Sequence, residues 1–70
     1  MKASEINVGS IYTDEIEERR VLDVRHILGA IYIEYKIIKN IKGQGRLPVG
    51  FRGTCKLSPT FCRWAKERVL

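Results

Sequence analysis

Apolar and polar residues alternate most clearly between Ala30 and Ile38. In an extended chain, one face of this segment would carry Ile31, Ile33, Tyr35 and Ile37, and the other Tyr32, Glu34, Lys36 and Ile38. β-Branched and aromatic residues lose rotamer freedom in a helix, so this composition favours a strand. Both faces include apolar residues, and we therefore expect the second face to be partly covered.

Shorter β patterns flank this segment. Ile11-Tyr12-Thr13 follows Gly9 and Ser10, as a short strand follows an entry turn. Arg20 to Arg25 is aliphatic and β-branched with charged ends, which is typical of a half-buried strand. His26 to Gly29 would connect the hairpin, with Gly29 as the residue best able to take a positive φ. Thr54 to Leu57 is a candidate closing strand.

A glycine-rich segment lies between Lys39 and Gly53. It contains four of the six glycines, one of the two prolines and four basic side chains. This composition predicts a long hairpin loop, or two turns around a short strand. It is not a phosphate-binding P-loop, because no Gly-Lys-Ser/Thr follows and no helix opens behind it.

The clearest helix signal begins at Ser58. Ser58 is a candidate N-cap, and Pro59 occupies the first helical position, where its missing N–H costs nothing. Leu57 is placed to pack on Cys62 as a hydrophobic staple. These signals predict a C-terminal α-helix over about residues 58–68, with Phe61 and Trp64 packing against the sheet.

Together the segments predict a mainly β fold. The layout Val8 to Tyr12, Arg19 to Val24 and the tyrosine-rich Ile31 to Tyr35 resembles SH3-like (Tudor/KOW-like) small β-barrels, over about residues 6–57. Small bacterial and phage-encoded domains share this layout. The resemblance implies an antiparallel barrel of four to five short strands that binds its partners through loops and one sheet face. The long basic loop departs from the pattern and leaves the number of strands after Ile38 open.

Length and composition limit the classes of protein. Seventy residues make one domain, 1–70, and 44% hydrophobic residues exclude a disordered tail. The longest uncharged apolar stretch, Ile27 to Ile33, is far shorter than the roughly 20 residues that span a bilayer. The first residues lack the apolar run of a secretory signal. We expect a small, soluble, cytoplasmic domain without a membrane partner.

The net charge of +5 is unevenly distributed along the chain. Residues 1–34 carry four basic and seven acidic side chains, whereas residues 35–66 carry eight basic side chains and no acid. Such asymmetry suggests a polyanionic partner, because Lys and Arg displace condensed counterions from phosphates. The alternative is a charged surface that only keeps a small protein in solution.

Catalytic and metal-binding signals are weak. His26, Cys55 and Cys62 are the candidate nucleophiles and ligands, and neither a C-x-x-C nor an H-x-x-x-H spacing occurs. Whether the two cysteines are ever bridged stays open. We expect no enzyme, no metal, no cofactor and no small-molecule substrate.

Two kinds of partner remain. A nucleic acid, DNA or RNA, would be held by its backbone on the basic glycine-rich loop, residues 39–53, and on the strands that carry it. The candidate contacts are basic residues with interleaved aromatics: Lys36, Lys39, Lys42, Arg46, Arg52, Lys56, Tyr32 and Phe51. No base-reading element is visible, so such contacts would be weakly sequence-specific. A protein-interaction module or small regulator of a larger complex is the alternative, with an acidic patch at Asp14, Glu15, Glu17 and Glu18. A domain without a dedicated ligand is the third possibility.

Overall fold

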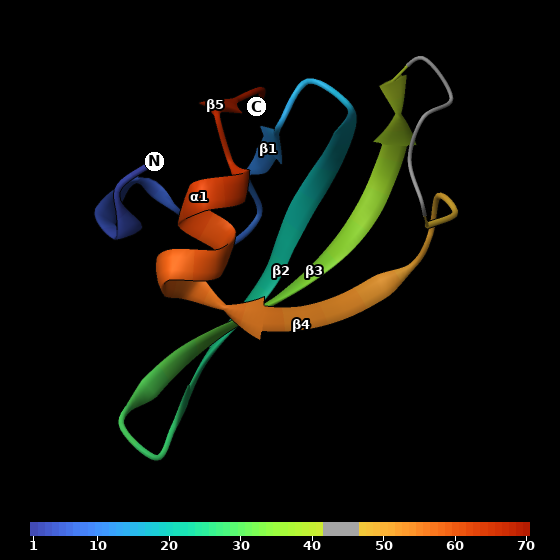
Figure 1. Ribbon diagram of the computed structural model, residues 1–70. Helices are drawn as coiled ribbons and strands as arrows, with labels where there is room; N and C mark the ends of the chain where they lie inside the picture. The colour runs from blue at the N-terminus through green and yellow to red at the C-terminus, as the bar shows by residue number, and fades with distance from the viewer. Residues whose placement is uncertain (42–46) are drawn as a thin grey trace.

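Five antiparallel strands form one sheet in the order β4–β3–β2–β1–β5 (Figure 1). The computed structural model describes residues 1–41 and 47–70. The strands are β1 (Ile11–Thr13), β2 (Glu17–Ile27), β3 (Ala30–Asn40), β4 (Arg52–Lys56) and β5 (Glu67–Arg68). The helical segments are η1 (Ala3–Glu5), η3 (Leu57–Phe61) and α1 (Cys62–Trp64). The prediction of a mainly β, antiparallel fold is confirmed.

The β2–β3 hairpin is the longest part of the sheet, with 11 residues in each strand. Its turn consists of Leu28 (φ 50°) and Gly29 (φ 81°), and two positive φ values at the centre are typical of a type I′ turn. β1 pairs with β2 only as far as Arg20, and β4 pairs with β3 only as far as Tyr32. The end of the hairpin therefore projects beyond its neighbours as a two-stranded ribbon (Figure 1).

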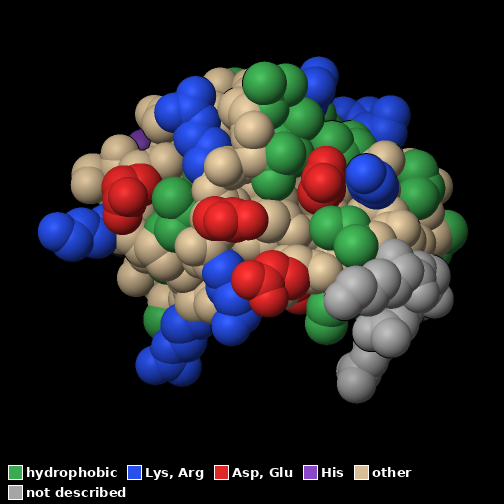
Figure 2. Space-filling model, turned by 90° about the horizontal axis from the view of Figure 1, so that it is seen from above, with side chains coloured by type: hydrophobic (Ala, Val, Ile, Leu, Met, Phe, Trp, Pro, Cys, Tyr) green, Lys and Arg blue, Asp and Glu red, His purple; other side chains and the backbone are tan. Residues whose placement is uncertain are grey.

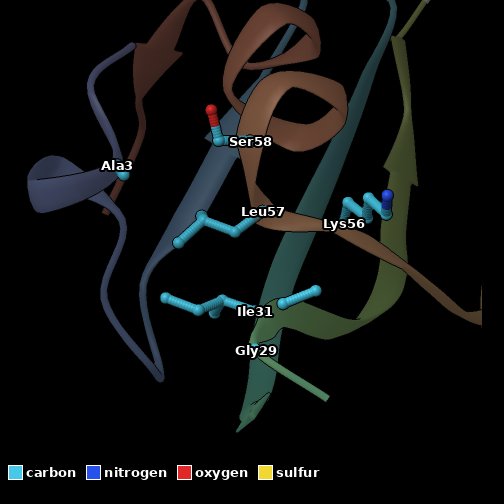
Figure 3. A pocket seen from close by; sticks show the side chains of 7 residues that line it. Ala3, Gly29, Ile31, Lys56, Leu57 and Ser58 are labelled. Carbon is cyan, nitrogen blue, oxygen red and sulfur yellow. The ribbon is translucent and has the colours of Figure 1, made fainter. Parts of the chain in front are cut away.

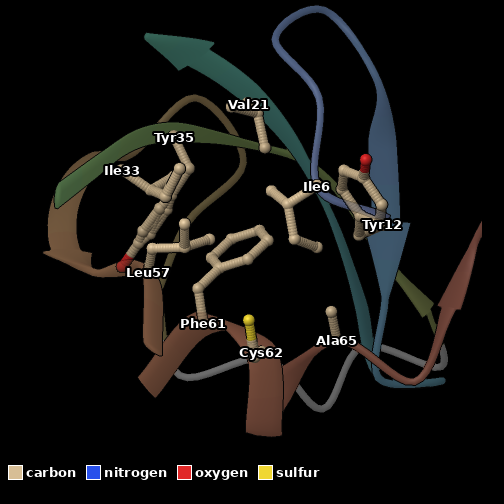
Figure 4. Close-up of a cluster of buried hydrophobic side chains, with 9 residues drawn as sticks. All are labelled: Ile6, Tyr12, Val21, Ile33, Tyr35, Leu57, Phe61, Cys62 and Ala65. Atoms are coloured by element: carbon tan, nitrogen blue, oxygen red, sulfur yellow. The ribbon is translucent and has the colours of Figure 1, made fainter. Parts of the chain in front are cut away.

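The hydrophobic core lies between the concave side of the sheet and the helical segments (Figure 4). Phe61 is fully buried at its centre, with its ring edge-on to those of Tyr12 and Tyr35 at centroid distances of 5.9 and 6.2 Å. Edge-to-face aromatic pairs add roughly 0.5–1.5 kcal/mol each beyond the area they bury. The cluster comprises Ile6, Tyr12, Val21, Ile33, Tyr35, Leu57, Phe61, Cys62 and Ala65.

The alternation in β3 correctly predicts its buried face. Ile33, Tyr35 and Ile37 are buried, and the opposite face is half-buried or exposed. Ile31 is the exception, because it belongs to the projecting ribbon, beyond the point where β4 covers β3.

The sheet is not closed into a barrel, which corrects that part of the fold prediction. β4 and β5 form its two edges, and within residues 1–41 and 47–70 they do not pair with each other. The helical segments η3 and α1 cover the concave side instead, so apolar surface is buried without strand closure (Figure 1). β2 and β3 are also longer than the short strands expected.

The predicted helix over about 58–68 is wrong at its C-terminal end. The helical segments end at Trp64, and Ala65 is already extended (φ −74°, ψ 115°). The chain then follows β1, where Lys66 N–H donates to Thr13 O at 2.9 Å and Val69 N–H donates to Ile11 O at 2.8 Å. Pairing with this free strand edge replaces the last turns of the helix.

Candidate nucleic-acid interface

Three exposed cations form a row across the sheet. In the antiparallel register, Arg20 of β2 lies opposite Lys36 of β3, and Lys36 lies opposite Arg52 of β4. Directly opposed residues point to the same face, and the sequence neighbours Val21 and Tyr35 point into the core. Arg20, Lys36 and Arg52 therefore share the face turned away from the helical segments, which we call the outer face.

A second row crosses the outer face nearer the hairpin turn. Arg25 lies opposite Tyr32, and Tyr32 lies opposite Lys56. The two cations are exposed and the tyrosine is half-buried. Lys36 and Tyr32 are four residues apart on β3, which separates the two rows by about 13 Å at the usual rise per residue.

Two carboxylates lie between these rows. Asp23 is opposite Glu34, and Glu34 is opposite Thr54. Arg25 binds both acids, with Nε 3.3 Å from Asp23 Oδ2 and Nη2 3.8 Å from Glu34 Oε1. Beyond the first row, Glu18 is opposite Lys39. The outer face thus carries three acids, Glu18, Asp23 and Glu34, and six cations, Arg20, Arg25, Lys36, Lys39, Arg52 and Lys56, a net charge of +3.

Most of the sequence-predicted nucleic-acid residues in the described part of the chain meet on this face. Lys36, Lys39, Arg52, Lys56 and Tyr32 all belong to it. The predicted residues Lys42 and Arg46 lie outside the described residues.

Phe51 is on the other side of β4. A side-chain carbon built on Gly53 would lie 2.7 Å from Tyr35 Oη and 3.0 Å from Phe51 Cε1. The Phe51 ring therefore shares the core side with the buried Tyr35 and is separated from the cations of the outer face.

Arg20 and Arg25 are site residues that the sequence prediction missed. Both belong to the acid-rich half of the chain, where counting charges in chain order hides them. Only the pairing of β2 with β3 brings Arg20 beside Lys36. The signal available in the sequence is the strand pattern of Arg20 to Arg25. In a strand, neighbouring side chains point to different faces, so Arg20 points away from the face that carries Val21.

The acidic segment 14–18 is not a uniformly exposed patch. Glu17 is only 7% exposed, and its carboxylate accepts a hydrogen bond from Arg19 Nε. Asp14 Oδ1 accepts the backbone N–H groups of Ile16 and Glu17 at 2.9 and 3.0 Å. Glu17 is buried because its side chain lies on the inward face of β2, where Arg19 also lies. In the view of Figure 2, acidic and basic side chains are interspersed and do not form separate patches.

Arg19 is held between two rings. Its Cζ atom lies 4.4 Å from the Tyr35 centroid and 4.1 Å from the Trp64 centroid.

Partial burial raises the pKa of the Cys55 thiol, and the positive charge of Arg19 opposes that rise. Cys55 and Cys62 are both free thiols.

An apolar pocket of about 300 Å³ lies at the base of the hairpin ribbon (Figure 3). It is lined by Ala3, Gly29, Ala30, Ile31, Lys56, Leu57 and Ser58. The side chains of Lys56 and Ser58 point away from one another, and the lining has no carboxylate or imidazole (Figure 3). The pocket therefore offers no acid–base pair or activated nucleophile.

Neither a metal-ligand cluster nor a membrane-spanning helix occurs within residues 1–41 and 47–70. No group of three or more His, Cys, Asp or Glu side chains there could hold a metal ion. None of the helices described there is long and apolar enough to cross a bilayer.

No family model matches the chain, and neither a curated protein nor a solved structure shows significant similarity to it. The resemblance to SH3-like barrels therefore stays a prediction based on strand layout.

Proposed function

We propose that this chain is a small, non-enzymatic binding module that holds a nucleic-acid backbone on the outer face of β2, β3 and β4. The observation that carries the proposal is the cross-strand row Arg20–Lys36–Arg52. Neighbouring strands are about 4.8 Å apart, so three cations fall within roughly 10 Å. Like charges at this spacing repel each other, and a bound polyanion relieves that repulsion.

The proposed site differs from the glycine-rich loop expected from the sequence alone. Lys39 and Arg52 flank the loop, whereas Lys36 and Lys56 stand on the strands that carry it. The strands fix the positions of these cations. Charges held on paired strands lose little conformational freedom on binding.

Contacts of this kind are weakly sequence-specific. Lys and Arg on a sheet face bind phosphate oxygens, which fix register but carry no base information. The α-helix α1 has three residues and packs on the opposite side of the sheet, so it cannot act as a recognition helix in a groove. We expect log affinity to fall linearly with log salt concentration.

Charge reversal at matched positions tests the proposal. The double variant Lys36→Glu/Arg52→Glu changes the first row, whereas Arg63→Glu/Lys66→Glu changes net charge equally at exposed positions beyond the core. Binding of labelled DNA and RNA would be followed by fluorescence anisotropy at about 50 and 200 mM salt. We expect the first variant to lose affinity about tenfold or more and the second to lose much less. Equal losses, or no salt-dependent binding by the wild type, would refute the proposal.

A protein-interaction role is the second candidate. The apolar side chains of Ile27 and Leu28 are exposed at the hairpin turn, and exposed apolar groups commonly mark contact surfaces. Replacing Glu15, an exposed acid that precedes β2 and lies outside the outer face, with Gln separates the two functions. Under the first function this variant keeps its nucleic-acid affinity, whereas under the second it loses a protein partner.

A further inference from the structure

We infer that the outer face takes single-stranded nucleic acid in preference to a duplex, with one base stacked on the ring of Tyr32. This inference rests on the proposed function and specifies its substrate class. It is carried by the neighbours of Tyr32 and by the acidic row that separates the two basic rows.

Tyr32 is an aromatic ring placed directly between two cations. Arg25 on β2 and Lys56 on β4 are its opposed partners, each about one strand spacing away. The ring pairs of the described residues join Tyr12, Tyr35, Phe61 and Trp64, and Tyr32 takes part in none of them. A half-buried ring outside the core can stack on a base whose adjoining phosphate contacts Lys56, while Arg25 on the other side is paired with Asp23 and Glu34.

The carboxylates between the basic rows disfavour a nucleic acid that presents only phosphates to the outer face. Asp23 and Glu34 lie midway along the roughly 13 Å between the rows, and together with Arg25, which pairs with both, they carry a net charge of −1 that repels a phosphate. A base meets no such repulsion, because carboxylates accept hydrogen bonds from the exocyclic amino groups of bases. The alternation of basic, acidic and basic rows therefore fits a strand that can turn its bases toward the protein.

The width of the site also keeps the bases of a duplex away from Tyr32. Tyr32 lies in the middle of three paired strands, whose outer two are roughly 10 Å apart before their side chains are counted. A minor groove is about 6 Å wide, and a major groove of about 12 Å admits a two-stranded ribbon. The bases of an intact duplex are therefore out of reach of Tyr32, whereas an unpaired base can reach it.

Four probes of about 12 nucleotides would test the inference: a single strand, its duplex, its RNA equivalent and a single strand with central abasic sites. Each is titrated into wild type, Tyr32→Ala and Tyr32→Phe, with folding checked by circular dichroism. We expect the single strand to bind about tenfold tighter than the duplex and the abasic strand. We also expect Tyr32→Ala to lose about tenfold on the single strand alone, and Tyr32→Phe to retain wild-type affinity because the ring remains.

The outcomes separate the inference from the function beneath it. Duplex affinity equal to that of the single strand, or wild-type affinity in Tyr32→Ala, refutes the inference and leaves the basic face as a backbone-binding site. Wild-type protein that binds none of the four probes in a salt-dependent way refutes the proposed function itself. The DNA and RNA strands together show whether the 2′-hydroxyl contributes.

Discussion

The guanidinium carbon of Arg19 lies 4.1 Å from the centroid of the Trp64 ring. Tyr35 covers the guanidinium with a second ring, and the Glu17 carboxylate accepts from its Nε atom. Because Trp64 belongs to α1 and Arg19 to β2, these contacts join the helix to the sheet at the edge of the core. Two charged residues therefore stabilise the packing of the C-terminal segment.

Replacing Arg19 with Met should destabilise the protein by about 2–4 kcal/mol. The substitution removes two cation–π contacts and leaves the buried Glu17 carboxylate without its partner. Chemical denaturation would measure the loss. In the double variant with Glu17→Gln, the loss should be smaller than the sum of the single losses, because the unpaired charge is gone. Additive losses would show that the ion pair contributes nothing.

The Cys55 thiol predicts a specific pH dependence. Burial raises its pKa above the ordinary value of 9.0, so the folded protein favours the neutral thiol. The stability that this provides is fully present below pH 9.0 and is lost as the pH rises through the higher pKa of the folded state. Denaturation midpoints of wild type and Cys55→Ala would be compared between neutral and alkaline pH. The wild type should lose more stability at the alkaline end, and parallel curves would contradict the assignment.

The hydroxyl of Tyr12 ties the N-terminal segment to the core. Its oxygen accepts the Asn7 N–H at 2.7 Å and donates to Glu5 O at 2.8 Å. Tyr12→Phe should cost about 1–3 kcal/mol, because two partly buried backbone groups lose their partner. Tyr32→Phe is the matched control and should change the free energy of unfolding little. Equal effects of the two variants would argue against this role of the Tyr12 hydroxyl.

Leu28 occupies a backbone conformation that disfavours it. Its φ is 50° and the residue is fully exposed to solvent, so no burial compensates for the left-handed conformation. Leu28→Asn gives the Asn-Gly pair preferred in type I′ turns and should stabilise the fold by about 0.5–1 kcal/mol. Ile27→Asn, one residue earlier in β2, should give no such gain because it loses β propensity. Thermal unfolding of both variants would decide the matter.

Local patterns predicted the middle of the fold well. The alternation through Ile33, Tyr35 and Ile37 specified the buried face of β3, and Gly29 marked the hairpin turn. The end of the helix was not predictable in this way. It depends on the hydrogen bond that Val69 donates to Ile11, and the local sequence carries no information about a strand edge so distant in the chain.

Charged residues account for two further differences between the sequence prediction and the structure. Glu17 and Arg19 are charged and two residues apart, a pattern typical of the exposed face of a strand. Their burial is favourable only because they pair with each other and because the rings of Tyr35 and Trp64 cover Arg19. The charge distribution along the chain predicts Lys36 and Arg52 as site residues, because both lie in its basic half. It does not predict Arg20, because the position of Arg20 beside Lys36 depends on strand register.

Arg20 thus provides the sharpest test of the cross-strand row. If the row binds phosphate, Arg20→Glu should weaken binding as much as Lys36→Glu, although it lies in the acid-rich half of the chain. Each variant should also lower the steepness of the salt dependence by about one phosphate contact relative to wild type. Anisotropy titrations at several salt concentrations would measure both quantities, with Arg63→Glu as the control for net charge. An Arg20→Glu variant that binds like Arg63→Glu would place the contacts away from the outer face of β2.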